Sequence, residues 1–490
     1  MRIRKEMKSV VLAGAVGFAG AAAVAASRDS RPNILLCLAD DLSAMNVGCY
    51  GDSQTRTPNL DKLAAKGIRF EHAYCSAPSC APSRASILTG RMAIELEEAA
   101  NLFGGFQSKY QVYTRLLEEA GYAVGFERKG WAPGNWKDFG WDHNPAGHEF
   151  GSFAEFMDQR PKDKPFCFWF GSLDPHLPYD DGYAEACGFM PEDIVLPAFL
   201  MDSPGTRKTF AGYLAEIARF DREVGERIDL LRENGELDNT LVVVSSDNGM
   251  PLPGAKTRLE DRGTQMPLIV YWEKGILKGG RVVKDFVSTS DLAPTFLDAA
   301  GIPIPETMSA RSLMPWLAST KSGQILESRD YIVTGRERHC PAQPDSWGGY
   351  PMRSIRTKDF LYIRNYEPDR WPQGNYPTFV DIDASACKND YVANWNNPEY
   401  RDYMALLQKQ PEEILYDLRQ DPNQLKNVAG SVQYAAVKKE LAEKMISRLQ
   451  SVDDPRMSAE GWRFDAYEWF TGWQHPAFGG TWRECGQEGL

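Results

Sequence analysis

The chain of 490 residues is too long for one small hydrophobic core, so we expect two domains or one large α/β domain with a smaller partner. Its hydrophobic share of 43% is typical of a globular protein, and no repeat of about 20–50 residues indicates a solenoid. With 67 acidic and 55 basic residues the net charge is −12 at pH 7, which argues against nucleic acid as a partner.

The first 27 residues predict a signal peptide. Four basic residues precede an apolar run at residues 10–26, which is rich in Ala, Gly and Val and ends in small side chains. We expect cleavage and export, to the periplasm or as a secreted protein, with no stable membrane span afterwards. Without cleavage the run would be a weak anchor, because it is short and rich in Gly and Ala for a spanning helix. Its removal takes away four basic residues and Glu6, so the mature net charge is about −15 and an anionic ligand requires a local basic pocket.

Apolar strands alternate with helices over the next 300 residues. The predicted strands are residues 33–39, 121–126, 166–170, 240–246 and 267–272. The predicted helices are residues 59–66, 84–88, 110–119, 209–234 and 290–300. Continuous apolar strands that alternate with helices predict an α/β fold whose large, mostly parallel sheet is covered on both faces.

Polar side chains follow three of these strands. Asp40 and Asp41 follow the first, His176 lies shortly after the third, and Asp247 and Asn248 follow the fourth. Ligands of such sheets bind beyond the carboxyl ends of the strands, so we expect one shared site there. Carboxylate and amide oxygens suit calcium, and the chain offers too few His and Cys side chains at this edge for zinc. Either pair alone would more often be an ordinary strand-ending turn.

The pattern changes after about residue 325. Short alternating strands are predicted at residues 331–334, 352–357, 360–365 and 414–418, followed by an amphipathic helix at 435–450. We expect a large α/β domain at residues 28–325. A C-terminal α+β subdomain at 326–490 would consist of a smaller antiparallel sheet, this helix and a tail, with four tryptophans, that wraps onto the main body.

The most specific segment is CAPSR at residues 80–84, followed by ASILTG at 85–90. A cysteine two positions before a proline and four before an arginine is the pattern that formylglycine-generating enzymes read. The segment resembles the signature of the type I sulfatases, in which this cysteine becomes an aldehyde whose hydrate attacks a sulfate ester. The resemblance implies that Cys80 is converted to formylglycine (3-oxoalanine) by a formylglycine-generating or an anaerobic sulfatase-maturing enzyme. Its place before a predicted helix suits an anion, because helix N-termini favour negative charge.

The resemblance extends over nearly the whole mature chain. Further matching segments are TPNLDKLA at residues 57–64, SSDNG at 245–249, PLIV at 267–270 and LYDL at 415–418. The resemblance implies an alkaline-phosphatase-like fold with residues 28–325 as the catalytic domain. It also implies a calcium ion bound by Asp40, Asp41, Asp247, Asn248 and the modified Cys80.

Four further residues match catalytic positions of the family. Arg84 would orient the formylglycine and help to hold the metal, and Lys129 matches the lysine of the family's lysine–histidine pair. His176 would contact the sulfate and the leaving oxygen, and Lys256 would contact the sulfate. Taken alone, Arg84 would be an ordinary surface arginine and His176 a structural cap.

One position departs from the family motif. The motif pairs a lysine with a histidine two residues later, and that histidine helps to expel sulfate from the covalent intermediate. Here Lys129 is followed by Trp131. Either His176 or a nearby acid acts as the base, or turnover is slow, or the tryptophan forms part of a substrate wall. The sequence leaves these alternatives open.

Two segments resemble the N-sulfoglucosamine sulfohydrolase (heparan N-sulfatase) branch: DNGMPLP at residues 247–253, with Lys256 shortly after, and YPMRS at 350–354. We nominate Arg336, Arg338, His339, Arg353 and Trp131 for contacts with a sulfated saccharide. The plain alternatives are solvated loop charges for the basic residues and core packing for the tryptophan.

The sequence thus predicts an exported sulfatase, a sulfuric ester hydrolase that cleaves a sulfate ester or sulfamate on a glycan. Two alternatives stay open. One is a phosphonate or phosphate ester hydrolase, because relatives of the same superfamily use similar sites. The other is a carbohydrate-binding pseudoenzyme, which the tryptophan in place of the histidine suggests.

Overall fold

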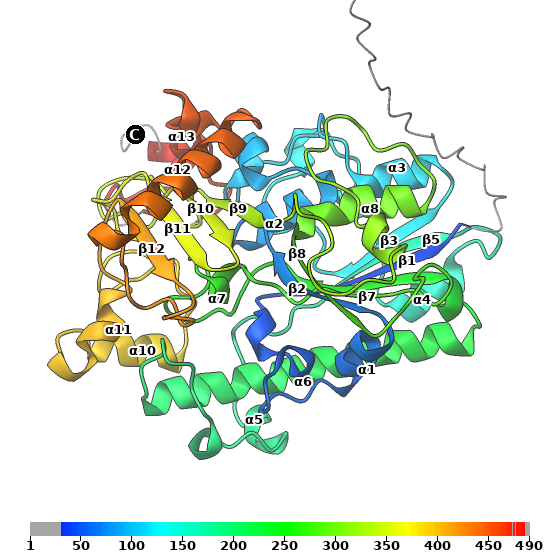
Figure 1. The fold of residues 1–490 in the computed structure, drawn as a ribbon, viewed down its shortest axis with the longest axis horizontal. Coiled ribbons are helices and arrows are strands. Elements are labelled where there is room, and N and C mark those ends of the chain that lie inside the picture. Colours follow the sequence, from blue (N-terminus) through cyan, green and yellow to red (C-terminus); the bar gives the residue numbers. More distant parts are fainter. Residues whose placement is uncertain (1–30, 473, 476, 486–490) are drawn as a thin grey trace, which may run out of the picture.

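The computed structural model describes residues 31–472, 474, 475 and 477–485 (Figure 1). The predicted signal peptide at residues 1–27 lies outside the described residues. An eight-stranded sheet forms the centre of the larger part, in the order β4-β3-β5-β1-β6-β7-β2-β8. The strands are β1 (Asn33–Ala39), β2 (Ile68–Tyr74), β3 (Ala123–Arg128), β4 (His148–Glu149), β5 (Phe166–Gly171), β6 (Thr240–Ser246), β7 (Ile269–Tyr271) and β8 (Arg281–Ser288). All neighbouring pairs are parallel except the two that involve β7, so the predicted mostly parallel sheet is confirmed.

Helices cover both faces of this sheet, and the sequence of β1 shows why. Every residue of β1 is buried, and alternate side chains enter two different cores. On one face, Leu35 and Cys37 pack with the core that includes α1 (Pro58–Lys66) and α6 (Pro204–Glu233). On the other, Leu36 packs with α2 (Cys80–Thr89), α3 (Tyr113–Glu119) and α8 (Leu292–Ala299) (Figure 1). A strand buried on both faces has to be apolar at every position, as this one is.

The long helix α6 begins five residues earlier than predicted. Its first residue is Pro204, and the Ser203 side chain accepts a hydrogen bond from the Thr206 backbone N–H as the N-cap. Proline is tolerated at the first helical position because that N–H has no intrahelical partner. The segment 204–208 lacks apolar periodicity, so the helix start is set by the cap.

The C-terminal part contains the predicted antiparallel sheet in the order β12-β11-β10-β9. Its strands are β9 (Tyr331–Arg336), β10 (Met352–Thr357), β11 (Phe360–Asn365) and β12 (Glu413–Asp417). Helix α12 (Ala435–Gln450) packs its apolar side, including Leu441 and Met445, against this sheet. The domain boundary at residue 326 stays a prediction.

The last described residues pack on the main body. The Phe470 backbone N–H donates to the Phe103 carbonyl, and the Trp469 ring meets the Phe103 ring edge to face. Among the described residues, no helix is both long enough and apolar enough to cross a bilayer.

Candidate active site

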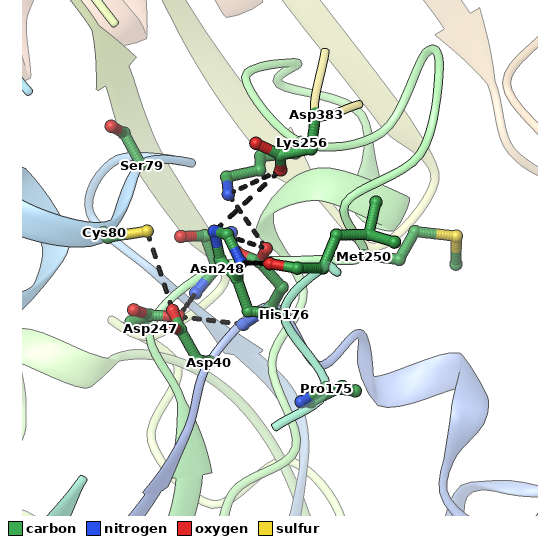
Figure 2. A network of polar contacts seen from close by, with 12 residues as sticks. Asp40, Ser79, Cys80, Pro175, His176, Asp247, Asn248, Met250, Lys256 and Asp383 are labelled. Carbon is green, nitrogen blue, oxygen red and sulfur yellow. Dashed lines mark hydrogen bonds and ion pairs between the residues drawn. The ribbon is translucent and has the colours of Figure 1, made fainter. Parts of the chain in front are cut away.

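Four adjacent parallel strands deliver polar side chains to one edge of the sheet. In the order β3-β5-β1-β6, the residues just beyond the strand ends are Lys129, then His176, then Asp40 and Asp41, then Asp247 and Asn248. Figure 2 shows Asp40, Asp247 and Asn248 together with Cys80 and His176. The residues that the sequence predicted at one shared edge therefore lie together.

Helix α2 brings two more residues to the same place. Cys80 is its first residue and Arg84 lies one turn later, so both side chains point from one face of the helix. Arg84 is fully buried; its Nε donates to Asp247 Oδ2 at 2.8 Å, and its Nη1 donates to the Lys129 carbonyl at 2.8 Å. Arg84 thus ties the cysteine helix to two strand ends. This position is compatible with the orienting role that the family resemblance implies for Arg84.

Three carboxylates and three cations form one buried network. Lys129 Nζ lies 2.6 Å from Asp40 Oδ2, and Lys256 Nζ lies 2.8 Å from Asp41 Oδ2. Burial raises the pKa of Asp40, but the charges of Lys129, Arg84 and His176 outweigh burial and hold that pKa well below its usual range. Burial likewise opposes the charge of each lysine, but the neighbouring carboxylates hold both lysine pKa values above the ordinary value. Lys129 and Lys256 are therefore positively charged, and such charges can attract a sulfate dianion or a sulfate monoester anion.

The oxygen donors fit a hard divalent cation. Ligand atoms of Asp40, Cys80 and Asp247 lie within 4.8 Å of one another. The Asn248 amide donates its N–H₂ to Asp41 Oδ1 at 2.6 Å, which turns its oxygen the other way. That oxygen, Oδ1, is buried and has no hydrogen-bond partner among the described residues. A buried carbonyl oxygen without a partner costs about 1–3 kcal/mol, and a calcium ion is the kind of group that would satisfy it.

The Cys80 thiol itself is a poor nucleophile. The residue is buried, its Sγ lies 3.6 Å from Asp40 Oδ1, and burial raises the pKa of the thiol far above the usual value. Only a thiolate reacts readily, and the neighbouring carboxylates disfavour one. A free thiol at this position would therefore react only weakly as a nucleophile.

His176 presents a defined nitrogen to the site. Its Nδ1 contacts the Leu177 carbonyl oxygen, which accepts only, so Nδ1 carries the proton. Its Nε2 lies 3.7 Å from Asp41 Oδ2 and is left for exchange of a proton with a substrate. The side chain is 29% exposed, whereas the strand-end acids are at most 3% exposed. His176 thus faces the open side of the site.

The backbone is unusual beside three of the site residues. Asp41 itself (φ 74°), Arg128 before Lys129 (φ 61°) and Thr257 after Lys256 (φ 68°) adopt left-handed conformations. For a β-branched residue such as Thr257 this conformation is a genuine outlier, and each such residue costs about 1–3 kcal/mol. Strain of this size persists only where the surrounding structure holds it, as happens at sites that position side chains.

Sequence reasoning missed one residue of the site. Asp383 precedes α10 (Ala386–Ala393), and its Oδ2 lies 3.0 Å from Lys256 Nζ and 4.0 Å from His176 Nε2 (Figure 2). No strand ends before it and no motif contains it. The only local signal was the Asp-Ile-Asp triplet that it forms with Asp381 and Ile382, which is too common to suggest a site.

Three nominated substrate residues are used inside the protein. Arg336 forms an ion pair with Asp381 and donates to the Thr257 carbonyl. Arg338 donates to the backbone carbonyls of residues 465 and 467. Arg353 forms ion pairs with Glu337 and Asp454. All three are at most 2% exposed. Their guanidinium groups bind the loops and the tail of the protein itself. The prediction that these three arginines contact the substrate is therefore corrected.

His339 lies closer to the site. Its Nδ1 is 2.8 Å from Ser79 Oγ, in the residue before Cys80, and the side chain is 5% exposed. Burial, helped by Lys256 and Arg336, holds the pKa of His339 well below its usual value, so this imidazole is neutral. A role in substrate contact stays a prediction for His339.

Trp131 packs in the core and forms no wall of an open pocket. It is 1% exposed, its ring meets the Phe106 ring with centroids 5.0 Å apart, and its indole N–H donates to the Ala81 carbonyl at 3.0 Å. The indole thus supports the first turn of α2 from beneath. Its nomination as a substrate-binding residue is corrected, because a buried side chain offers no face to a sugar.

Replacing Trp131 with Ala should therefore act mainly on stability. We expect a loss of about 3–5 kcal/mol in the free energy of unfolding, because the change leaves a large cavity in the core beside the helix. Urea unfolding measures this value. The matched control is Trp462→Ala, since Trp462 is 62% exposed and should cost less than about 0.5 kcal/mol. If Trp131→Ala lowered the free energy of unfolding by less than about 1 kcal/mol and strongly weakened saccharide binding, Trp131 would instead be a substrate-binding residue.

Comparison with known proteins identifies the family. The family model described as "Sulfatase" matches residues 32–302, more than half of the chain. The chain belongs to the sulfatase family. A second model, "N-sulphoglucosamine sulphohydrolase, C-terminal", matches residues 255–372. The predicted family and its N-sulfoglucosamine sulfohydrolase branch are thus confirmed, and the chain is a sulfuric ester hydrolase by family.

Curated sulfatases resemble the chain over most of its length. Human N-sulphoglucosamine sulphohydrolase is 29% identical over 486 residues, which cover 88% of this chain and 92% of that protein. An ulvan-active sulfatase from Formosa agariphila is 28% identical over 447 residues, which cover 86% and 81%.

Solved structures share the fold at lower identity. BT4656, in complex with its substrate D-glucosamine-2-N,6-O-disulfate, has a TM-score of 0.61 at 20% identity and covers 86% of this chain and 98% of its own. A phosphonate monoester hydrolase of Agrobacterium radiobacter has a TM-score of 0.66 at 18% identity, covering 86% and 96%. The predicted alkaline-phosphatase-like fold of the sulfatases is confirmed.

Proposed function

We propose that this sulfatase removes a sulfate group from a saccharide, using a formylglycine made from Cys80 and a calcium ion. The observation that carries the proposal is the group of acidic oxygens and cations around Cys80, together with the Asn248 oxygen, which has no hydrogen-bond partner in the described part of the chain. When bound, calcium would neutralise the anion and favour the ionised nucleophile, with Asp40, Asp41, Asp247 and Asn248 as protein ligands. The formylglycine hydrate would supply the hydroxyl that attacks sulfur.

The remaining residues of the site act on charge and protons. Lys129 and Lys256 are protonated and would bind sulfate oxygens, which compensates the charge that develops during transfer. Arg84 would fix the helix that carries Cys80 against the strand-end acids. His176 Nε2 would protonate the leaving oxygen or nitrogen, since it is the exposed imidazole nitrogen that faces the site.

His176 would also act as the base in place of the histidine that the family motif has where this chain has Trp131. Trp131 is buried, and its indole nitrogen has no lone pair to accept a proton. After it has protonated the leaving group, His176 would be neutral and could take a proton from the hydroxyl that remains on the modified Cys80 side chain. Loss of that proton would favour release of sulfate. One imidazole would thus serve as acid and then as base.

Several features support a glycan substrate and export. Human N-sulphoglucosamine sulphohydrolase and the ulvan-active sulfatase are relatives over most of the chain, and BT4656 binds a sulfated glucosamine. The predicted signal peptide would carry the enzyme to the periplasm or the medium, where glycan degradation begins. The maturing enzyme would be a formylglycine-generating or anaerobic sulfatase-maturing enzyme.

Matched aryl esters test the reaction class. We expect the matured enzyme to release sulfate from 4-nitrophenyl sulfate at least about 100-fold faster, as kcat/KM, than it releases nitrophenol from 4-nitrophenyl phosphate or phenylphosphonate esters. The reverse order would favour the phosphonate or phosphate hydrolase, which shares the fold. Binding of sulfated sugars by a matured chain without any turnover would favour the pseudoenzyme.

A further inference from the structure

Asp383 is the exposed carboxylate of the site. Its side chain is 29% exposed, as is that of His176, whereas Asp40, Asp41 and Asp247 are at most 3% exposed. It also lies at residue 383, beyond both matched family regions, which end at residues 302 and 372. A group in this position can meet a substrate, and the family resemblance does not assign it a role.

The position of Asp383 is fixed by its neighbours in sequence. Asp381 is buried against Arg336 and accepts from the Cys340 backbone N–H at 2.9 Å. The Ile382 side chain is buried in the core, and its carbonyl accepts from Lys388 Nζ at 2.8 Å. Anchored in this way, Asp383 projects toward Lys256 and His176 in Figure 2. A rigidly held acceptor is suited to recognition because little freedom is lost on binding.

Asp383 loses its nearest cation, Lys256, once the site is loaded, and keeps only His176 Nε2 at 4.0 Å. Lys256 Nζ lies between Asp41 and Asp383, at 2.8 and 3.0 Å, so an ammonium already fills the space between these two acids. In the proposed function Asp41 binds calcium and Lys256 turns toward the sulfate. Asp383 then needs a hydrogen-bond donor, because an ionised carboxylate only accepts.

A cavity of about 210 Å³ is formed by the chain segments that follow His176 and Asp383. It is lined by residues 177–182, which follow His176, by residues 384–386, which follow Asp383, and by parts of α5 (Tyr183–Ala186) and α6. Asp180, Asp181 and Glu185 lie on its wall, with Lys208 as their one basic neighbour among the lining residues. Lys208 is itself paired with Asp181 at 2.8 Å. The cavity is therefore acidic and would repel a second sulfate or a carboxylate.

We propose that Asp383 and this cavity form a saccharide subsite that accepts hydrogen bonds from hydroxyl or amino groups next to the scissile sulfate. This inference rests on the proposed function. The enzyme then selects sugars whose positions beside that sulfate carry donors, and it rejects sugars that are sulfated or carboxylated there. Selection by a negative group works through both attraction of donors and repulsion of anions.

Asp383→Asn tests the subsite with three probes: N-sulfoglucosamine, glucosamine 6-O-sulfate and 4-nitrophenyl sulfate. For whichever sugar the wild type cleaves faster, we expect kcat/KM to fall about 10- to 100-fold, the effect of losing a charge-assisted hydrogen bond. For 4-nitrophenyl sulfate, which has no hydroxyl beside the ester, we expect a smaller loss, so the ratio of kcat/KM on the sugar to kcat/KM on the aryl sulfate should fall. Asp369→Asn, an exposed carboxylate of the same C-terminal part, is the matched control and should change neither.

A doubly sulfated probe tests repulsion. The wild type should cleave N-sulfo-3-O-sulfoglucosamine more slowly than N-sulfoglucosamine. In Asp383→Asn the difference between the two rates should be smaller. An equal loss on the sugar and on the aryl sulfate would overturn the inference, because Asp383 would then serve only to hold Lys256 and His176. Failure of the wild type to release sulfate from every probe would contradict the proposed function itself and the inference with it.

Discussion

Replacing Cys80 with Ala should lower kcat/KM for sulfate release at least about 10⁴-fold, because the variant lacks the atom from which the nucleophile is made. The protein should fold normally, since the change removes one sulfur atom at a position that is 3% exposed and keeps the first turn of α2. Sulfate release from 4-nitrophenyl sulfate measures the rate, and thermal unfolding checks the fold.

The control for this variant is Cys49→Ala. Cys49 is a partly buried cysteine of another segment that contacts no residue of the site. It should keep wild-type activity. If Cys80→Ala hydrolysed the sulfate ester within about tenfold of the wild-type rate, a nucleophile derived from Cys80 would be excluded.

Removal of calcium is expected to have the second large effect. Chelation should reduce activity to below about 1%, and added calcium should restore it, because the sulfate would otherwise face Asp40, Asp41 and Asp247 without the metal. A second measurement is independent of turnover. Calcium at about 100 times its dissociation constant should stabilise the fold by about 2.7 kcal/mol, seen as a rise in Tm.

Asn248→Ala separates the metal from the rest of the network. It removes the oxygen that has no partner among the described residues while leaving every charge in place. We expect the calcium-dependent rise in Tm to require at least about tenfold more calcium. Asp158→Asn, an exposed carboxylate, is the control and should titrate like the wild type. A calcium response that is unchanged in Asn248→Ala would remove this residue from the metal site.

The strand-end part of the site could be predicted because it depends on local order. An apolar strand that is buried on both faces is visible in the sequence, and the residue after it lies at the edge where parallel strands meet. Asp40, His176 and Asp247 follow from that rule alone. Cys80 and Arg84 were predicted from the resemblance of residues 80–84 to the sulfatase signature, and the structure places both on helix α2, which begins four residues before the predicted helix.

The other residues depend on partners that lie far away in the sequence. Arg353 resembles a loop charge until Glu337 and Asp454 are seen on either side of it. Asp383 reaches the site because its neighbours are anchored, and no pattern of its own reveals that. Strands β2 and β8 were not predicted, because charged residues interrupt the apolar run of each strand, such as the partly exposed Arg69 and the exposed Lys284.

The mass of the peptide that contains Cys80 tests the central claim most directly. Digestion with trypsin should give the peptide of residues 70–84, from the chain expressed in a host that carries out the modification. Conversion of the thiol to the aldehyde replaces hydrogen sulfide with oxygen, so we predict a peptide about 18 Da lighter than the sequence requires. A peptide that carries only unmodified cysteine, in a preparation that hydrolyses sulfate at full rate, would contradict the account.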